Sequence, residues 1–133
     1  MPIKKTTIKA FKAVIHLGLE YHYDKRPIDE NQVIAYIQQY QDQLIEQKKI
    51  YLSCSITKSL IVLSGQKEEH LQIGFINYPK FPLSHKVLKT EIEKLARSLM
   101  DEFQQNRLVI EYLDQTLMLE KSGEIDSRIK TDD

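Results

Sequence analysis

The sequence predicts a two-layer α+β sandwich, in which two helices cover one face of a six-stranded mixed sheet. Several stretches alternate apolar and polar residues, as half-buried strands do. Two other stretches carry a single apolar stripe at helical spacing. The order strand, helix, strand, strand occurs twice, so we expect one domain over residues 1–121 with half-repeats at about 9–65 and 70–121. Residues 122–133 have few apolar side chains and are expected to form a flexible tail.

The first strand and first helix have the clearest patterns. Every odd position from Phe11 to Tyr23 is apolar or aromatic, whereas the even positions are mostly polar. This predicts a long strand with one face on the core. Pro27 then breaks the strand, and Asp29 is a suitable N-cap for a helix that reaches about Gln47. Its apolar stripe consists of Val33, Ile37, Tyr40 and Leu44.

The remaining elements follow from the same two periods. Alternation predicts a second strand over residues 51–57. Lys58 and Ser59 are expected to form a tight reversal into a short interior strand over 60–63, which is apolar on both faces. The other predicted elements are a polar turn over 65–69, a strand over 70–77, a helix from Ser84 to about Phe103, and a hairpin with strands over 107–113 and 116–120.

The two strand-to-helix junctions resemble one another. Tyr23–Asp29 reads YDKRPID and Tyr78–Ser84 reads YPKFPLS, so tyrosine, lysine and proline recur in register. The resemblance favours an internal duplication. The alternative is that any such junction needs a residue that stops the strand and a cap that begins the helix. In both cases the junction is interpreted as a structural joint, with the two tyrosines covering the edge of the core.

Composition and charge narrow the classes of partner. Lysine plus arginine number 19, as do aspartate plus glutamate, so no net positive charge attracts nucleic acid or an anionic membrane. Cys54 is the only cysteine, which excludes an internal disulfide and fits a reducing compartment. The N-terminal residues lack the apolar core of a signal peptide, and the run Leu60–Leu63 is too short to span a bilayer. We therefore expect a cytoplasmic protein with no nucleic-acid or membrane partner.

The uncovered face of the predicted sheet is where we expect a ligand or a partner to bind. Strand residues on that face would present imidazole, carboxylate and hydroxyl groups, which can hydrogen-bond a ligand. These candidates are His16, Glu20 and His22 from the first strand, Tyr51, Ser53 and Ser55 from the second, and Glu111 from the fifth. The alternative is a solvated face without a binding role, which such sheets often have.

The candidate residues do not form a pattern typical of a metal or cofactor site. His16 and Glu20 would lie roughly 13 Å apart along one strand, which is too far to share an ion. The four glycines are scattered and form no phosphate-binding loop. We therefore predict no metal and no cofactor.

These observations favour a small binding or protein-interaction module over an enzyme. Its partner is an unknown protein or small molecule, and the uncovered face also suits self-association into a homodimer. The alternative starts from Pro2, because the opening residues MPI and the repeated strand–helix–strand order resemble the tautomerase superfamily. That resemblance implies an N-terminal proline acting as general base in a trimer or larger assembly. The first strand-to-helix junction, at residues 24–29, comes later than in that family.

Overall fold

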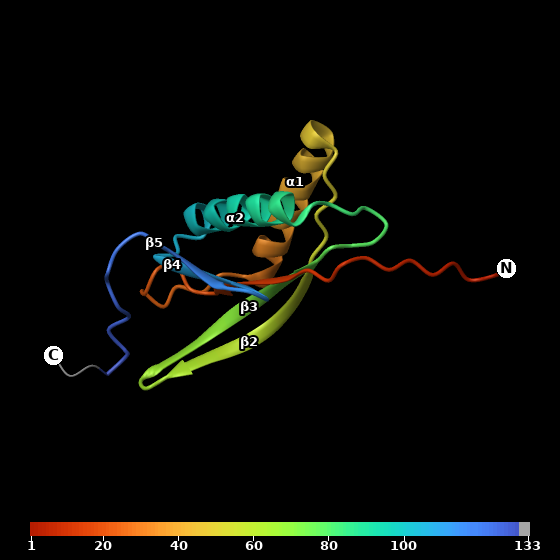
Figure 1. Cartoon of the computed structure of the whole chain (residues 1–133). Coiled ribbons are helices and arrows are strands. Elements are labelled where there is room, and N and C mark those ends of the chain that lie inside the picture. Colours follow the sequence, from red (N-terminus) through yellow and green to blue (C-terminus); the bar gives the residue numbers. More distant parts are fainter. Residues whose placement is uncertain (131–133) are drawn as a thin grey trace.

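The computed structural model describes residues 1–130 of the chain. Five strands form one sheet, and two helices lie together on one of its faces (Figure 1). In chain order the elements are β1 (Lys12–Gly18), α1 (Glu30–Lys48), β2 (Ser55–Leu63), β3 (Gln66–Ile76), α2 (His85–Glu102), β4 (Arg107–Tyr112) and β5 (Thr116–Glu120). The sheet face opposite the helices is called the open face below.

The strand order is β2-β3-β1-β4-β5, and every neighbouring pair is antiparallel. The predicted α+β class, with two helices on one sheet, is therefore confirmed. The predicted number and kind of strands are wrong, because the sheet has five antiparallel strands instead of six mixed ones. The internal duplication and the division into half-repeats stay predictions.

The missing sixth strand is explained by the continuity of β2. Lys58 and Ser59 do not reverse the chain, since they pair with Leu71 and His70 of β3 within one uninterrupted ladder. A polar pair fits inside a strand because its two side chains point to opposite faces. The chain instead turns after Leu63, where Ser64 has a positive φ of 53°.

The expected polar turn over residues 65–69 lies mostly within β3, which begins at Gln66. β2 is an edge strand, not the predicted interior strand. The β2–β3 hairpin extends past the helices (Figure 1), and Leu60, Val62 and Leu63 are exposed there. The apolar run therefore does not indicate burial on both faces.

The core lies between the helices and the sheet. Ala13, Ile15 and Leu17 of β1 are fully buried, as alternation predicts. The predicted length of this strand is wrong, because β1 ends at Gly18 and not at Tyr23, and the chain turns at His22, which has a positive φ of 51°. Apolar side chains of both helices complete this layer: Val33, Ile37 and Leu44 from α1, and Leu88, Ile92, Leu95 and Leu99 from α2. Burying each large aliphatic side chain stabilises the fold by about 1.5–3 kcal/mol. The same alternation directs Val14 and His16 to the open face.

Both helices begin at the predicted caps. The Asp29 carboxylate accepts a hydrogen bond from the Asn31 amide at 2.9 Å, and the Ser84 hydroxyl accepts one from the Val87 amide at 3.2 Å. These bonds satisfy amides that have no partner inside the helix. The two junctions therefore set where α1 and α2 start over the sheet.

The two ends of the described chain differ. The N-terminal arm, residues 1–10, forms no helix or strand and extends away from the sheet (Figure 1). Residues 122–130, called the C-terminal strap below, turn back over the open face, where Asp126 is only 2% exposed. The strap is the described part of the expected flexible tail, and residues 131–133 of that tail lie outside the described residues.

Candidate functional site

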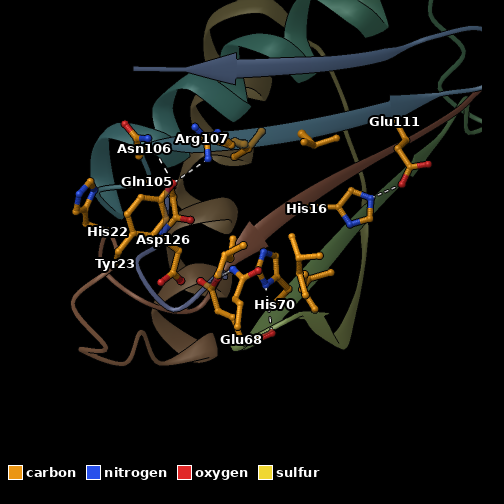
Figure 2. A pocket seen from close by; sticks show the side chains of 16 residues that line it. His16, His22, Tyr23, Glu68, His70, Gln105, Asn106, Arg107, Glu111 and Asp126 are labelled. Atoms are coloured by element: carbon orange, nitrogen blue, oxygen red, sulfur yellow. Dashed lines mark hydrogen bonds and ion pairs between the residues drawn. The ribbon is translucent and has the colours of Figure 1, made fainter. Parts of the chain in front are cut away.

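A cavity of about 450 Å³ lies on the open face, beneath the C-terminal strap (Figure 2). Its floor comes from side chains of β1, β3 and β4, including His16, Glu68, His70 and Glu111. One wall comes from the loops that follow β1 and α2, and the strap contributes Asp126 and Ile129. A volume of this size is typical of sites for small organic ligands.

Strand pairing explains why these side chains meet. His16 of β1 lies opposite Gln72 of β3 on one side and Val109 of β4 on the other. Side chains two positions apart share a face, so Glu68 and His70 of β3 lie on the same side of the sheet as His16. By the same rule, Glu111 shares that side with Val109. The local alternation thus fixes the chemical character of the cavity floor.

Glu68 is the most perturbed acid of the cavity. It is only 6% exposed, and Gln66 Nε2 donates a hydrogen bond to its Oε2 at 3.0 Å. Burial, and after it the nearby Glu20 carboxylate, raise the pKa of Glu68 to about 7. The carboxyl group is therefore close to half ionised at neutral pH. It can exchange a proton or pair with a cation under ordinary conditions.

His70 lies beside Glu68 on the same strand. Its Nδ1 donates a weak hydrogen bond to the Glu68 carbonyl at 3.4 Å. Burial lowers the pKa of His70, so its ring is neutral at pH 7. With the proton on Nδ1, the other ring nitrogen can accept a hydrogen bond from a ligand.

His16 and Glu111 form a pair across β1 and β4, at the far end of the cavity in Figure 2. His16 Nε2 lies 2.5 Å from Glu111 Oε1. The histidine side chain is 18% exposed, whereas the glutamate side chain is 56% exposed. The pair therefore places a polar, water-facing edge on a cavity whose other end is buried.

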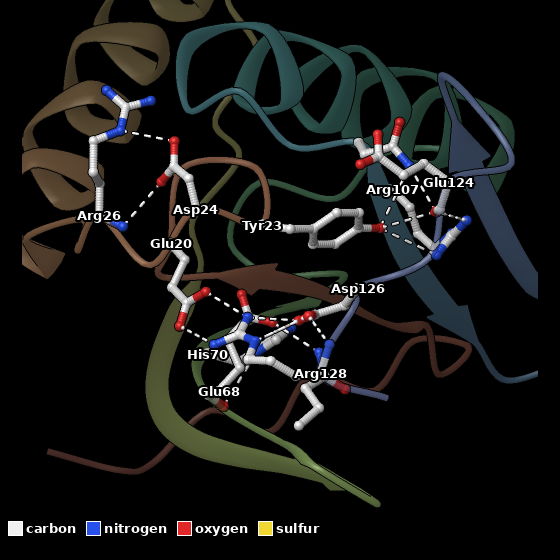
Figure 3. Close-up of polar contacts among 12 residues, drawn as sticks. Glu20, Tyr23, Asp24, Arg26, Glu68, His70, Arg107, Glu124, Asp126 and Arg128 are labelled. Atoms are coloured by element: carbon white, nitrogen blue, oxygen red, sulfur yellow. Dashed lines mark hydrogen bonds and ion pairs between the residues drawn. The ribbon is translucent and has the colours of Figure 1, made fainter. Parts of the chain in front are cut away.

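The strap is held by an ion-pair network around Arg128 (Figure 3). Its guanidinium donates to both carboxylate oxygens of Glu20, at 3.0 and 2.7 Å, and also to Asp126. Hydrogen bonds from Arg128 hold the pKa of Asp126 below its usual range. The pKa of Arg128 is raised, since Asp126 and Glu20 both stabilise its charge. Asp126 therefore stays ionised although it is buried.

A second set of contacts ties the strap to β4 and the loop after β1. Arg107 donates to the Tyr23 hydroxyl at 3.2 Å and to the Glu124 carbonyl at 2.9 Å. His22 Nε2 lies 3.1 Å from a Glu124 carboxylate oxygen. The His22 and Tyr23 rings contact one another, with centroids 4.7 Å apart. The wall of the cavity is thus an aromatic pair whose tyrosine is fixed through its hydroxyl.

The structure divides the residues predicted to bind a ligand. His16, His22 and Glu111 line the cavity, and Glu20 lies at its edge through Arg128. Ser53 and Ser55 line a separate hollow of about 350 Å³. Tyr51 stacks on Phe81 with centroids 4.5 Å apart. Tyr51 and Ser53 precede β2, which begins only at Ser55, later than expected. Ser55 is separated from His16 because β3 lies between their strands, and Ser55 pairs with Gly74 whereas His16 pairs with Gln72.

Sequence reasoning missed Glu68, because residues 65–69 were interpreted as a turn. Residues 66–70 are all polar, so the sequence has no alternation of apolar and polar residues there that would indicate a strand. Asp126 and Arg128 were missed for another reason. Their partner Glu20 is more than a hundred positions away, and no local pattern encodes such a contact.

Two features are absent from residues 1–130. Among residues 1–130, no group of three or more histidine, cysteine, aspartate or glutamate side chains could hold a metal ion. Neither α1 nor α2 combines the length and the apolar character needed to cross a bilayer.

The architecture is thus that of a small α+β protein with a ligand-sized cavity on its open sheet face. No protein-family model matches the sequence, and no curated protein matches it. Solved structures do match. Phage SAM lyase in complex with S-methyl-5′-thioadenosine is 18% identical with a TM-score of 0.63, covering 90% of this chain and 96% of that chain. The apo state of phage SAM lyase is 17% identical, with the same TM-score and coverage. At this identity the likeness shows a shared fold.

Proposed function

We propose that this chain binds S-adenosylmethionine in the open-face cavity and cleaves it to S-methyl-5′-thioadenosine. The first support is the fold, which matches phage SAM lyase over nearly the full length of both chains. The second is that the matching fold here contains a cavity of ligand size on its open face. The chain therefore has both the fold of phage SAM lyase and a cavity of its own that could hold the substrate.

The observation that carries the proposal is the buried Glu68 carboxyl group, whose pKa is raised to about 7. S-adenosylmethionine has a sulfonium and an ammonium group, and both are positive. A carboxylate in a partly water-excluded cavity attracts such a cation more strongly than an exposed carboxylate does. Asp126 also lines the cavity, but its charge is already paired with Arg128. Glu111 lines the cavity as well, but its side chain is 56% exposed. Glu68 is therefore the buried acid available to the substrate.

The proposed reaction needs no co-reactant. A carboxylate oxygen of the bound substrate attacks its own γ-carbon, and the bond between that carbon and sulfur breaks. The electron pair of the broken bond stays on sulfur, which leaves as the neutral thioether S-methyl-5′-thioadenosine. The other product is homoserine lactone, which retains the ammonium group, so atoms and charge balance. The step neutralises a sulfonium with a carboxylate, and surroundings of low polarity favour such a change.

The role of the protein in this step is to bind, bend and desolvate the substrate. Tyr23 is held by its hydroxyl bond to Arg107, so the His22–Tyr23 ring pair can contact a planar base. His70 offers a hydrogen-bonding group to ribose hydroxyls or to base edges. The strap covers this end of the cavity and limits the access of water.

The two functions predicted from sequence are related to this proposal in different ways. A binding module is the outcome if the thioadenosine ligand binds without reaction. The tautomerase alternative requires a partly desolvated Pro2 amine, because desolvation lowers the amine pKa. Pro2 is exposed in the extended N-terminal arm (Figure 1), so the described chain gives it no such surroundings.

The test is incubation of the purified full chain with S-adenosylmethionine, followed by chromatographic detection of S-methyl-5′-thioadenosine. We expect product with the wild-type chain and at least about tenfold less with Glu68→Gln, equal to about 1.4 kcal/mol. Glu69→Gln is the matched control, because Glu69 is the exposed neighbour on the same strand. Calorimetric binding of S-methyl-5′-thioadenosine without turnover would favour the binding module. The absence of both binding and turnover would contradict the proposal.

A further inference from the structure

Gly18, the last residue of β1, lies directly against the Glu68 carboxyl group. A Cβ atom at position 18 would be 2.4 Å from Glu68 Oε1 and 3.0 Å from Gln105 Oε1. The first of these distances is well inside van der Waals contact. The space that a side chain would take at position 18 is therefore occupied by the carboxylate of Glu68.

The backbone itself does not require glycine at this position. Residues with positive φ often need glycine, but Gly18 does not have positive φ. Glycine inside a strand also weakens the strand, because it adds backbone entropy and packs no side chain. The reason for glycine here is consequently the space it leaves on the open face, not the conformation of the chain.

The neighbours of Gly18 determine which group would move if that space were filled. Gln105 is only 7% exposed, and its Nε2 donates to the carbonyls of Glu20 and Phe103, both at 2.9 Å. These two bonds hold its side chain in place. Glu68 Oε1, in contrast, is the far end of a flexible side chain. A methyl group at position 18 would therefore displace the carboxylate and leave Gln105 where it is.

We propose that Gly18 is a positioning residue that admits the Glu68 carboxylate to the floor of the cavity. Its role in catalysis rests on the proposed lyase function, but its effect on Glu68 does not. Filling the space turns Glu68 away from the buried end of the cavity toward water. The cationic substrate then loses its partner, while the sheet and its core stay intact.

The experiment compares Gly18→Ala with Gly74→Ala in the full-length chain. Gly74 is the matched control because it is a strand glycine on the same face, and its added Cβ would meet Ser55 Oγ at 3.0 Å, away from Glu68. The Glu68 carboxyl carbon is titrated by NMR. In the wild type its pKa is expected near 7, in Gly18→Ala it should fall toward its ordinary value of 4.5, and in Gly74→Ala it should not change. A folded Gly18→Ala chain with an unchanged Glu68 pKa would overturn the inference.

A second measurement separates this inference from the lyase proposal. If the wild-type chain does not turn over S-adenosylmethionine, the titration still decides whether Gly18 positions Glu68. If it does turn over, Gly18→Ala should lower kcat/KM about tenfold or more, as Glu68→Gln does. Glu68→Asp shortens the side chain and makes room for the methyl group. The combined Gly18→Ala/Glu68→Asp chain should therefore lose less kcat/KM than the sum of the losses, in free energy, of the two single variants. Strict additivity of the two losses would count against the inference. If Gly18→Ala alone does not fold, a folded combined chain supports the inference, and a combined chain that does not fold counts against it.

Discussion

Arg128 in the C-terminal strap and Glu20 after β1 form a two-pronged ion pair, with N–O distances of 3.0 and 2.7 Å. Both side chains are largely buried, at 19% and 16% exposure, and Arg128 also pairs with Asp126. Pairs of this geometry are stronger and more specific than single surface contacts. The pair closes the strap over the cavity, and its removal should open the strap.

Arg128→Gln is accordingly expected to release the strap. The change leaves Glu20 and Asp126 without their cation, and uncovering them lets water solvate both carboxylates. We expect faster amide hydrogen exchange over residues 122–130 and a loss of stability of about 1–3 kcal/mol. Arg97→Gln is the control, because Arg97 pairs with Glu93 on the exposed side of α2 and should cost less than about 0.5 kcal/mol. Unchanged exchange in the strap would show that the ion pair does not hold it.

Glu68 should make stability depend on pH. Its pKa is raised from 4.5 to about 7 in the folded chain, so the folded state binds the proton more readily than the unfolded state. The corresponding stability is fully present below pH 4.5 and is lost as the pH rises through 7. The effect is at most about 3 kcal/mol, and water entering the cavity reduces it.

Urea unfolding at several pH values between 4 and 8 measures this effect. Glu68→Gln should flatten the decline between pH 4.5 and 7, whereas Glu69→Gln should retain it. The neighbouring His70 has a lowered pKa, so charging it destabilises the fold at the acid end of the range. A decline that persists unchanged in Glu68→Gln would mean that another group causes it.

Ligand charge should determine how binding depends on pH. The fraction of Glu68 in the ionised form rises about eightfold between pH 6 and pH 7.5 for a pKa of about 7. The affinity for S-adenosylmethionine, a cation, should rise by a similar factor. The affinity for neutral S-methyl-5′-thioadenosine should change little. Calorimetry with both ligands checks this difference, and equal slopes for the two would exclude Glu68 as the partner of the positive charge.

Gly65→Ala should displace the strap without touching its charges. A Cβ at position 65 would lie 2.1 Å from the Arg128 carbonyl oxygen, which is backbone and cannot rotate away. We expect increased hydrogen exchange in the strap and weaker ligand binding. Gly123→Ala is the control, since a Cβ at that position meets nothing within 4 Å. If amide hydrogen exchange in the strap is the same in Gly65→Ala as in the wild type, the end of the β2–β3 hairpin moves together with the strap.

The elements that were predicted correctly are those whose pattern is local. Alternation around His16 gives its strand and its face, and the caps at Asp29 and Ser84 give the starts of both helices. The prediction failed where one local pattern fits two structures. Lys58-Ser59 suits a turn as well as a strand, and only pairing with β3 decides between them. The cover that the strap gives the cavity depends on the contact of Arg128 with Glu20, which only the folded chain brings together.

The position of the strap also fixes the order in which the site is assembled during synthesis. Residues 122–130 leave the ribosome after every strand of the sheet, yet they bind Glu20 near the beginning of the chain and Ser64 near its middle. A nascent chain that ends at β5 can already pair all five strands. It lacks the cover of the cavity. The sheet can therefore form before residues 122–130 have emerged, and the cavity is covered only after they have.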